Sequence, residues 1–228
     1  MVRKRDGNEV VLIDSSIRTA SGALISTPLY VLSGLIYAAV ISPAATGTFF
    51  FVSIATALVL RPVRGISQTL QKLGSEPGER VGSYLGVALL FTAGYLLVGS
   101  GGATLVADVL TRRTVFTAGL LLPAGLYAAS LSVSIIVSSL LGAIGYPSAQ
   151  TWLGGVRLGT QLLLIVVFDA FVTSAAELLL VSAGVRFALF VPVGAALGVT
   201  PQVPDRHALT RTWEFARWSV PDQILDRL

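Results

Sequence analysis

The sequence predicts an all-α integral membrane protein, arranged as a six-transmembrane-helix bundle. Of its 228 residues, 54% are hydrophobic and only 12% are charged, whereas about 25% of the residues of an ordinary soluble domain are charged. The mean hydropathy is +0.78. Uncharged runs extend from Thr19 to Leu60, from Val81 to Ala107 and from Thr114 to Val156. Since a membrane helix needs about 20 mainly apolar residues, each run can cross a bilayer, and the longest must contain turns.

Six spans are expected between these turns. Their approximate bounds are 20–41, 46–66, 82–105, 115–141, 148–169 and 172–198. The breaks are SPAATG (42–47), GSEPGER (74–80), ADVLTRR (107–113), GYPSAQ (145–150) and a short turn near Asp169, because such Gly-, Pro- and charge-rich segments punctuate helices. The chain is therefore divided into an amphipathic amino terminus (1–18), a six-helix membrane lobe (19–199) and a polar, basic tail (200–228).

The tail is predicted to hold an amphipathic helix from His207 to Trp218. Its Trp213 and Trp218 suit a membrane interface, where aromatic rings with one polar edge gather.

The basic residues predict the topology. Twelve Lys and Arg fall on the side of the membrane that holds the amino terminus, and only Arg112 and Arg113 fall on the other; Arg157 and Arg186 lie within spans five and six. Because cytoplasmic loops carry an excess of Lys and Arg, both termini are expected in the cytoplasm, with the protein in the plasma membrane. The amino-terminal basic residues are followed by acidic ones, so the first span is expected to be a retained signal anchor.

Composition also excludes several kinds of site. The chain has no cysteine and one histidine, which rules out disulfides, thiolate metal sites and a Ser-His-Asp triad in the membrane region. No catalytic residue, metal or cofactor is expected. The net charge of +4 is accounted for by basic residues that flank the spans, so nucleic acid is not an expected partner.

A polar stripe is predicted at the end of span two. On a helix, the spacing of Arg61, Arg64, Gln68 and Lys72 places these four side chains within about 80° of one another around the helix axis. The apolar Ile66, Leu70 and Leu73 lie on another side of the helix. Pro62 is expected to bend this helix without necessarily ending it. Two interpretations stay open: the arginines reach lipid phosphates at the cytoplasmic surface, or the stripe faces an interior cavity and binds an anionic group.

Four segments in order carry a family resemblance. They are LIYAAVISPAATGTFFFVSIA with Pro43, Gly47 and Phe49; RGISQTLQKLGSE with Gly65, Ser67, Gln68 and Lys72; SSLLGAIGYPSAQTWLGGVRLGTQLLL with Gly142, Gly145, Gln150 and Arg157; and WEFARWSVPDQILD. In this order they resemble the amino-terminal half of Wzx-type polysaccharide flippases, in the multidrug, oligosaccharidyl-lipid and polysaccharide exporter superfamily. The resemblance implies one lobe of a twelve-to-fourteen-helix MATE-like transporter. Unlike the family, the link between spans four and five has no basic residue.

This resemblance implies a function. The lobe would move a polyprenyl- or dolichyl-linked oligosaccharide by alternating access, in polysaccharide or lipopolysaccharide biosynthesis. Arg61 and Arg64 would contact the pyrophosphate, with Gln68 and Lys72 near the cytoplasmic entrance, and Arg18 and Arg157 would add to the substrate site. The resemblance reaches Leu228 just where the family's second half begins, so a second lobe or a homodimer is an expected partner.

Acids within the membrane region could couple transport to an ion. Glu177 and Asp169 are candidates to bind a proton or sodium ion. The alternatives are that these acids are solvated at span ends, or that Glu177 pairs with Arg157 of the neighbouring helix. Two other interpretations stay open for the chain: a structural or accessory membrane protein or inactive fragment that transports nothing, and a membrane-embedded enzyme, which the scattered acids disfavour.

Overall fold

The computed structural model describes residues 9–105 and 118–225, with side chains described over 20–102, except residue 25, and over 119–218. Within these ranges every regular element is helical and no strand is present. The elements are α1 (Glu9–Val40), α2 (Pro43–Val59), α3 (Arg61–Leu73), α4 (Val81–Leu105), α6 (Ala118–Ala143), α7 (Pro147–Val167), the 3-10 turn η1 (Asp169–Phe171), α8 (Ala175–Ala196) and α9 (Arg206–Leu225). The predicted all-helical class is therefore confirmed.

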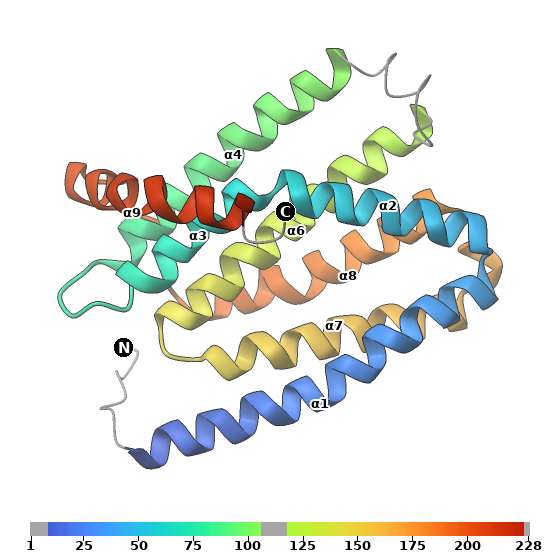
Figure 1. Cartoon of the computed structure of the whole chain (residues 1–228), viewed down its shortest axis with the longest axis horizontal. Coiled ribbons are helices and arrows are strands. Elements are labelled where there is room, and N and C mark those ends of the chain that lie inside the picture. Colours follow the sequence, from blue (N-terminus) through green and yellow to red (C-terminus); the bar gives the residue numbers. More distant parts are fainter. Residues whose placement is uncertain (1–8, 106–117, 226–228) are drawn as a thin grey trace.

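The helices run up and down along one direction. Figure 1 shows the α1–α2 and α7–α8 turns at one end of the bundle, and the α3–α4, α6–α7 and α8–α9 connections at the other. The main neighbours are α6 with α8 and α1 with α7. This alternation follows from the short turns, since a connection of a few residues returns the next helix beside the previous one.

Four of these helices are long and apolar enough to cross a membrane. They are Ala20–Val40, Val81–Gly102, Gly119–Ala143 and Ala175–Ala196. A fifth span results if α2 and α3 are counted together, although they are bent by 55° at their junction. The remaining expected span, α7, is 21 residues long, but its mean hydropathy is too low for it to count as a membrane span on its own. The polar side chains of Gln150, Arg157 and Gln161 lower this hydropathy. Six crossings are therefore not confirmed.

The bend between α2 and α3 has a local cause. Pro62 lies in the first turn of α3, where its ring removes a backbone donor that would otherwise continue α2. The Tyr95 hydroxyl of α4 donates a hydrogen bond of 2.6 Å to the carbonyl of Val59, beside the break. The predicted bend at Pro62 is thus present, and a side chain from another helix satisfies a backbone acceptor beside it.

The core forms one large cluster towards each end of the bundle, and a smaller third cluster of Val137, Leu141 and Phe190 joins α6 and α8. The cluster near the α1–α2 turn contains Tyr37, Phe49, Tyr127, Leu162 and Leu178, with their neighbours on α1, α2, α6, α7 and α8. The other large cluster joins α3, α4, α6 and α9 through Leu70, Tyr84, Leu140, Ala208 and Ala216. Large apolar side chains also cover the perimeter; exposed examples are Leu24, Val31, Leu35, Ile54, Leu97, Val98, Leu122, Leu163 and Val167. Such a perimeter fits a lipid environment better than water.

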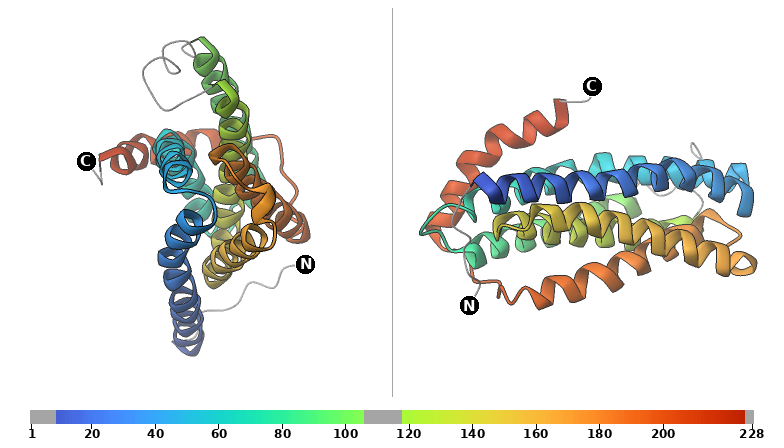
Figure 2. Two further views of the ribbon diagram at one scale, coloured as in Figure 1. Left: turned by 90° about the vertical axis from the view of Figure 1, so that its right-hand side faces the viewer. Right: turned by 90° about the horizontal axis from the view of Figure 1, so that it is seen from below.

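The tail packs back onto the bundle. Its linker crosses α4 so closely that a Cβ on Gly86 would lie 2.0 Å from the carbonyl oxygen of Gln202. The amide of Gln202 also donates a hydrogen bond of 2.9 Å to the carbonyl of Gly82. Figure 2 shows α9 leaving the end of the bundle at a steep angle to the long helices. The predicted tail helix is present, and it is longer than the expected segment from His207 to Trp218.

Candidate functional site

The helix α3 separates polar from apolar side chains as its spacing predicted. Val63, Ile66 and Leu70 are buried, whereas Arg64 and Lys72 are exposed and Arg61 and Gln68 are half-buried. The four stripe residues therefore lie on the less buried side of one helix, directly after the break from α2. The positive charges of Arg61 and Arg64, in the first turn after the break, can attract an anionic group.

The tail helix contacts the far end of this stripe. The Lys72 Nζ lies 4.8 Å from the ring centroid of Phe215 on α9, a cation–π geometry. Beyond α3, the Arg211 Nη2 donates to a Glu76 carboxylate oxygen at 2.7 Å. This negative charge raises the pKa of Arg211 above its ordinary value. The docking of α9 therefore holds the end of α3 in place through both charged and aromatic contacts.

A second polar contact of the tail centres on Glu79. His207 Nε2 lies 3.2 Å from one carboxylate oxygen of Glu79, and the Tyr84 hydroxyl donates to the other at 3.0 Å. These hydrogen bonds, that from His207 first, lower the pKa of Glu79 below its ordinary value, because both favour the ionised carboxylate.

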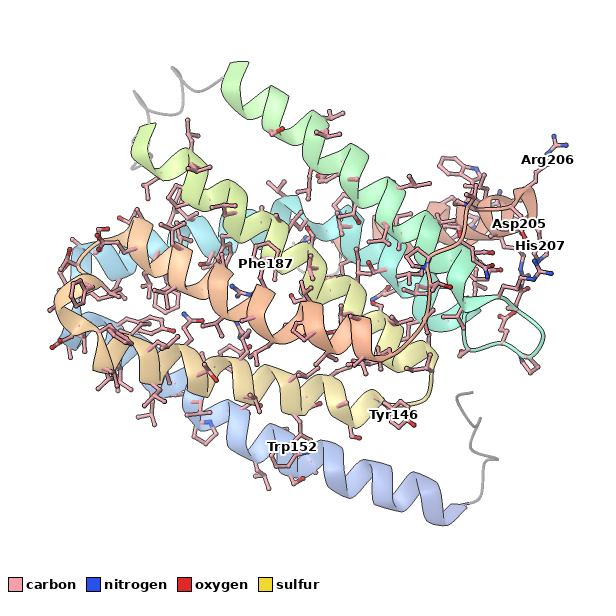
Figure 3. The ribbon with its side chains drawn as sticks, turned by 180° about the vertical axis from the view of Figure 1, so that it is seen from behind. Tyr146, Trp152, Phe187, Asp205, Arg206 and His207 are labelled. Carbon is pink, nitrogen blue, oxygen red and sulfur yellow. The ribbon has the colours of Figure 1, made fainter. Side chains whose placement is uncertain are left out.

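These residues line a polar hollow of about 500 Å³ between the α3–α4 loop and α9; its lining is Pro77, Gly78, Glu79, Arg80, Ser83, Tyr84, Asp205, His207 and Ala208. Figure 3 shows Asp205, Arg206 and His207 together where α9 begins. The Asp205 carboxylate accepts a hydrogen bond of 2.7 Å from the amide of Ala208 and so caps the helix. Sequence reasoning did not find this hollow, although the GSEPGER loop and the PDRH segment of the tail contain its charged residues.

The structure does not bring Arg157 next to the α3 stripe. Arg157 lies on α7, whose main neighbours are α1 and α8, and its Nη2 donates to the Tyr30 hydroxyl of α1 at 2.9 Å. The alternative pairing with Glu177 is not formed. For Arg18, only the backbone belongs to the described part of the chain, as a residue of α1, and its side chain lies outside it.

Glu177 caps the amino terminus of α8. Its carboxylate accepts hydrogen bonds from the amides of Thr173, at 2.7 Å, and Ser174, at 2.9 Å, while the Ser174 hydroxyl accepts from the Glu177 amide at 3.3 Å. This is a capping box, the usual way of satisfying free amides at a helix amino terminus. Asp169 is exposed and accepts from the amide of Ala170 at 2.7 Å. Both acids thus have local partners.

An apolar hollow of about 280 Å³ lies beside these acids, lined by Leu164, Phe168, Phe171, Val172, Leu180 and Val181, with Glu177 as its one charged residue. Over the described ranges, no group of three or more His, Cys, Asp or Glu residues could hold a metal ion.

The fold defines the class of the protein. Over the described residues it is all-helical, with four to five helices long and apolar enough to cross a membrane. Comparison of the chain with protein-family models, with curated proteins and with solved structures finds no match.

Proposed function

We propose that this chain is a membrane transport lobe that binds a lipid-linked oligosaccharide of the polyprenyl- or dolichyl-phosphate type and moves its headgroup by alternating access. The lobe would lie in the plasma membrane with both termini in the cytoplasm. It would act with a second lobe or with a second copy of itself, because alternating access needs two bodies that move about one site.

The observation that carries this proposal is the broken span formed by α2 and α3. Transporters commonly build substrate sites where a membrane helix is interrupted. Here the 55° break is followed at once by Arg61 and Arg64 on the less buried side of α3. Guanidinium groups bind phosphates by paired hydrogen bonds and keep their charge, so a phosphate-bearing headgroup is the substrate class that fits this stripe.

The other candidate residues take lesser roles in this proposal. Gln68 and Lys72 continue the stripe towards the docked tail, and Arg18 would join from the foot of α1. Arg157 would act elsewhere in the bundle, since α7 lies mainly beside α1 and α8. Glu177 and Asp169 remain proposals for ion coupling, although each already has hydrogen-bond donors at a helix start.

A binding experiment tests the stripe. The full chain is reconstituted in lipid nanodiscs, and the affinity for a fluorescent polyprenyl-pyrophosphate disaccharide is measured for the unaltered chain and for Arg61→Gln with Arg64→Gln. We expect the double variant to bind at least about tenfold more weakly, because it loses two charge-assisted contacts. The same change at Arg80, an exposed arginine of the α3–α4 loop, serves as the matched control and should leave the affinity unaltered.

The same experiment separates the transport lobe from the second candidate function, a structural or accessory membrane protein. The docked tail favours that alternative, because Ala208 and Ala216 are buried against the bundle and make the tail a stable part of this fold. Unaltered binding by the double variant, or equal losses in the double variant and in Arg80→Gln, would contradict substrate binding by the stripe. It would favour arginines that contact lipid phosphates at the membrane surface, and the accessory role.

A further inference from the structure

A buried arginine lies inside the apolar bundle, apart from the α3 stripe. Arg186 of α8 is only 5% exposed and precedes Phe187, which is labelled on α8 in Figure 3. Its Nη1 donates to the carbonyl of Ser182 and its Nη2 to the Tyr127 hydroxyl of α6, both at 3.2 Å. The guanidinium carbon also lies 4.5 Å from the centroid of the Tyr127 ring.

A second cation belongs to the same region. Arg157 of α7 donates to the Tyr30 hydroxyl of α1. One turn further along α7, Gln161 donates at 2.7 Å to the hydroxyl of Tyr37, which lies two turns beyond Tyr30 on α1. The Tyr37 ring and the Tyr127 ring, which carries the hydroxyl that Arg186 contacts, both pack edge-to-face against Phe49, with ring centroids 5.7 and 6.2 Å away. Together these side chains form the interior cluster, defined as Tyr30, Tyr37, Tyr127, Arg157, Gln161 and Arg186. Tyr37, Tyr127, Gln161 and Arg186 are buried, whereas Arg157 is half-buried and Tyr30, at the outer edge, is 55% exposed.

The interior cluster has two positive charges and no acid. Within the described part of the chain, no carboxylate lies within ion-pair distance of Arg157 or Arg186, and the only ion pairs are those of Glu79 and Glu76 with the tail. The nearest acids along these helices, Asp169 and Glu177, accept backbone hydrogen bonds at the end of the bundle. For Arg186, which is buried, the lack of a negative partner in an apolar interior is costly.

Donor groups remain available around Arg186. A guanidinium has five N–H donors, and the contacts of Arg186 use two of them. One turn before it, the Ser182 hydroxyl is fully buried and has no hydrogen-bond partner among the described residues. Both features are donors that an anionic acceptor could use.

We infer that the interior cluster is a second binding site, for a phosphate-type oxyanion held between Arg157 and Arg186. Two guanidiniums balance the charge of a phosphate dianion, and their planar donors match its oxygens in pairs. The Ser182 and tyrosine hydroxyls supply further donors. The anion would be either free phosphate or the headgroup of a phosphomonoester lipid. This site does not depend on the proposed transport function, because its residues lie on α1, α6, α7 and α8.

Two probes distinguish these sources. The full chain is placed in phosphatidylcholine nanodiscs, and binding of radiolabelled inorganic phosphate is measured; in parallel, unlabelled nanodiscs containing phosphatidic acid are tested for a rise in Tm, which ligand binding to the folded state produces. We expect at least one probe to act on the unaltered chain. Arg186→Gln and Arg157→Gln should each weaken that response at least about tenfold in affinity, the loss expected for one charge-assisted contact.

The Tyr127→Phe variant controls for a folding defect, because it keeps the ring beneath Arg186 and removes only the hydroxyl. It should weaken binding less than either arginine variant does. Arg80→Gln in the α3–α4 loop, an exposed arginine outside both proposed sites, is the matched control and should bind as the unaltered chain does. Binding of inorganic phosphate supports a free anion, and a response to phosphatidic acid alone supports a lipid headgroup. The inference is overturned if neither probe acts, if all three cluster variants respond normally, or if Arg80→Gln loses the response as well.

Discussion

Glu177 is an acid within an apolar segment whose role is decided by the residues just before it. Three donors, the amides of Thr173 and Ser174 and the Thr173 hydroxyl, approach its carboxylate. These contacts satisfy amides that have no partner inside the helix. An acid in such a position supports the start of α8 whether or not it also binds an ion.

The capping box can be tested through its serine. Ser174→Ala should lower the free energy of unfolding by about 1 kcal/mol, the usual loss for an N-cap hydroxyl, measured by denaturation in mixed micelles. Ser134→Ala is the control, because the Ser134 hydroxyl donates only to the carbonyl of Leu131 in its own helix; its effect should be much smaller. Equal effects of the two changes would contradict a specific role for the cap.

The docking of the tail should depend on pH through Glu79. Its pKa is lowered in the folded state by hydrogen bonds from His207 and Tyr84, so ionised Glu79 stabilises the docked tail above the ordinary carboxyl pKa of about 4.3. That contribution is lost as the pH falls through the lowered value. A nitroxide at Leu209→Cys, in this cysteine-free chain, should therefore become more mobile in acid.

Two variants check this pH dependence. Glu79→Gln should make the Leu209 nitroxide more mobile at neutral pH and reduce its response to acid. A nitroxide at Val191→Cys, an exposed position of α8, should not respond over the same range. If the label at Val191 became mobile together with that at Leu209, general unfolding rather than release of the tail would be the cause.

At the level of elements, two glycines of α4 decide where the tail lies. Gly82 and Gly86 let the backbone of the α8–α9 linker approach α4, and a Cβ at either position would lie 2.6 Å or less from a linker carbonyl oxygen. Backbone atoms at such a distance must move away, because a side chain cannot share their space.

Gly86→Val should therefore displace the linker and release α9. The expected result is much faster maleimide labelling of Ala216→Cys, a position that is 3% exposed when the tail is docked. Gly94→Val is the matched control on the same helix, because a Cβ there would meet nothing within 4 Å. Similar labelling rates in the two variants would show that the close approach at Gly86 does not hold the tail.

At the level of the whole molecule, the arrangement of α7 decides the number of crossings. α7 packs between α1 and α8 and runs beside them along the bundle, as Figure 2 shows. A helix with such neighbours can contain Arg157 and Gln161 because both side chains donate hydrogen bonds to hydroxyls of α1. We therefore expect α7 to cross the membrane although its own composition is less apolar.

Labelling from either side tests this crossing. Cysteines at Tyr146 and Asp169, both exposed at opposite ends of α7, should react with an impermeant maleimide from opposite sides of the membrane, Tyr146 from the cytoplasm and Asp169 from outside. Labelling of both from one side would mean that α7 does not span, and would contradict the six-crossing topology.

Several features could be read from the sequence because they depend on neighbours along the chain. Apolar length predicted the helices, Gly and Pro predicted most turns, and a spacing of three and four residues predicted the polar side of α3. The bend at Pro62 was predicted for the same reason, since a proline acts on its own turn.

The sequence by itself therefore determined the helical class, the apolar segments and the amphipathic character of α3. Only the tertiary structure decided that α9 docks on α3 and α4, that Arg157 meets Tyr30, and that Arg186 lies against Tyr127. The physical reason is that lipid and protein core are both apolar, so a membrane helix that is apolar all round carries no periodicity to show which side faces inward.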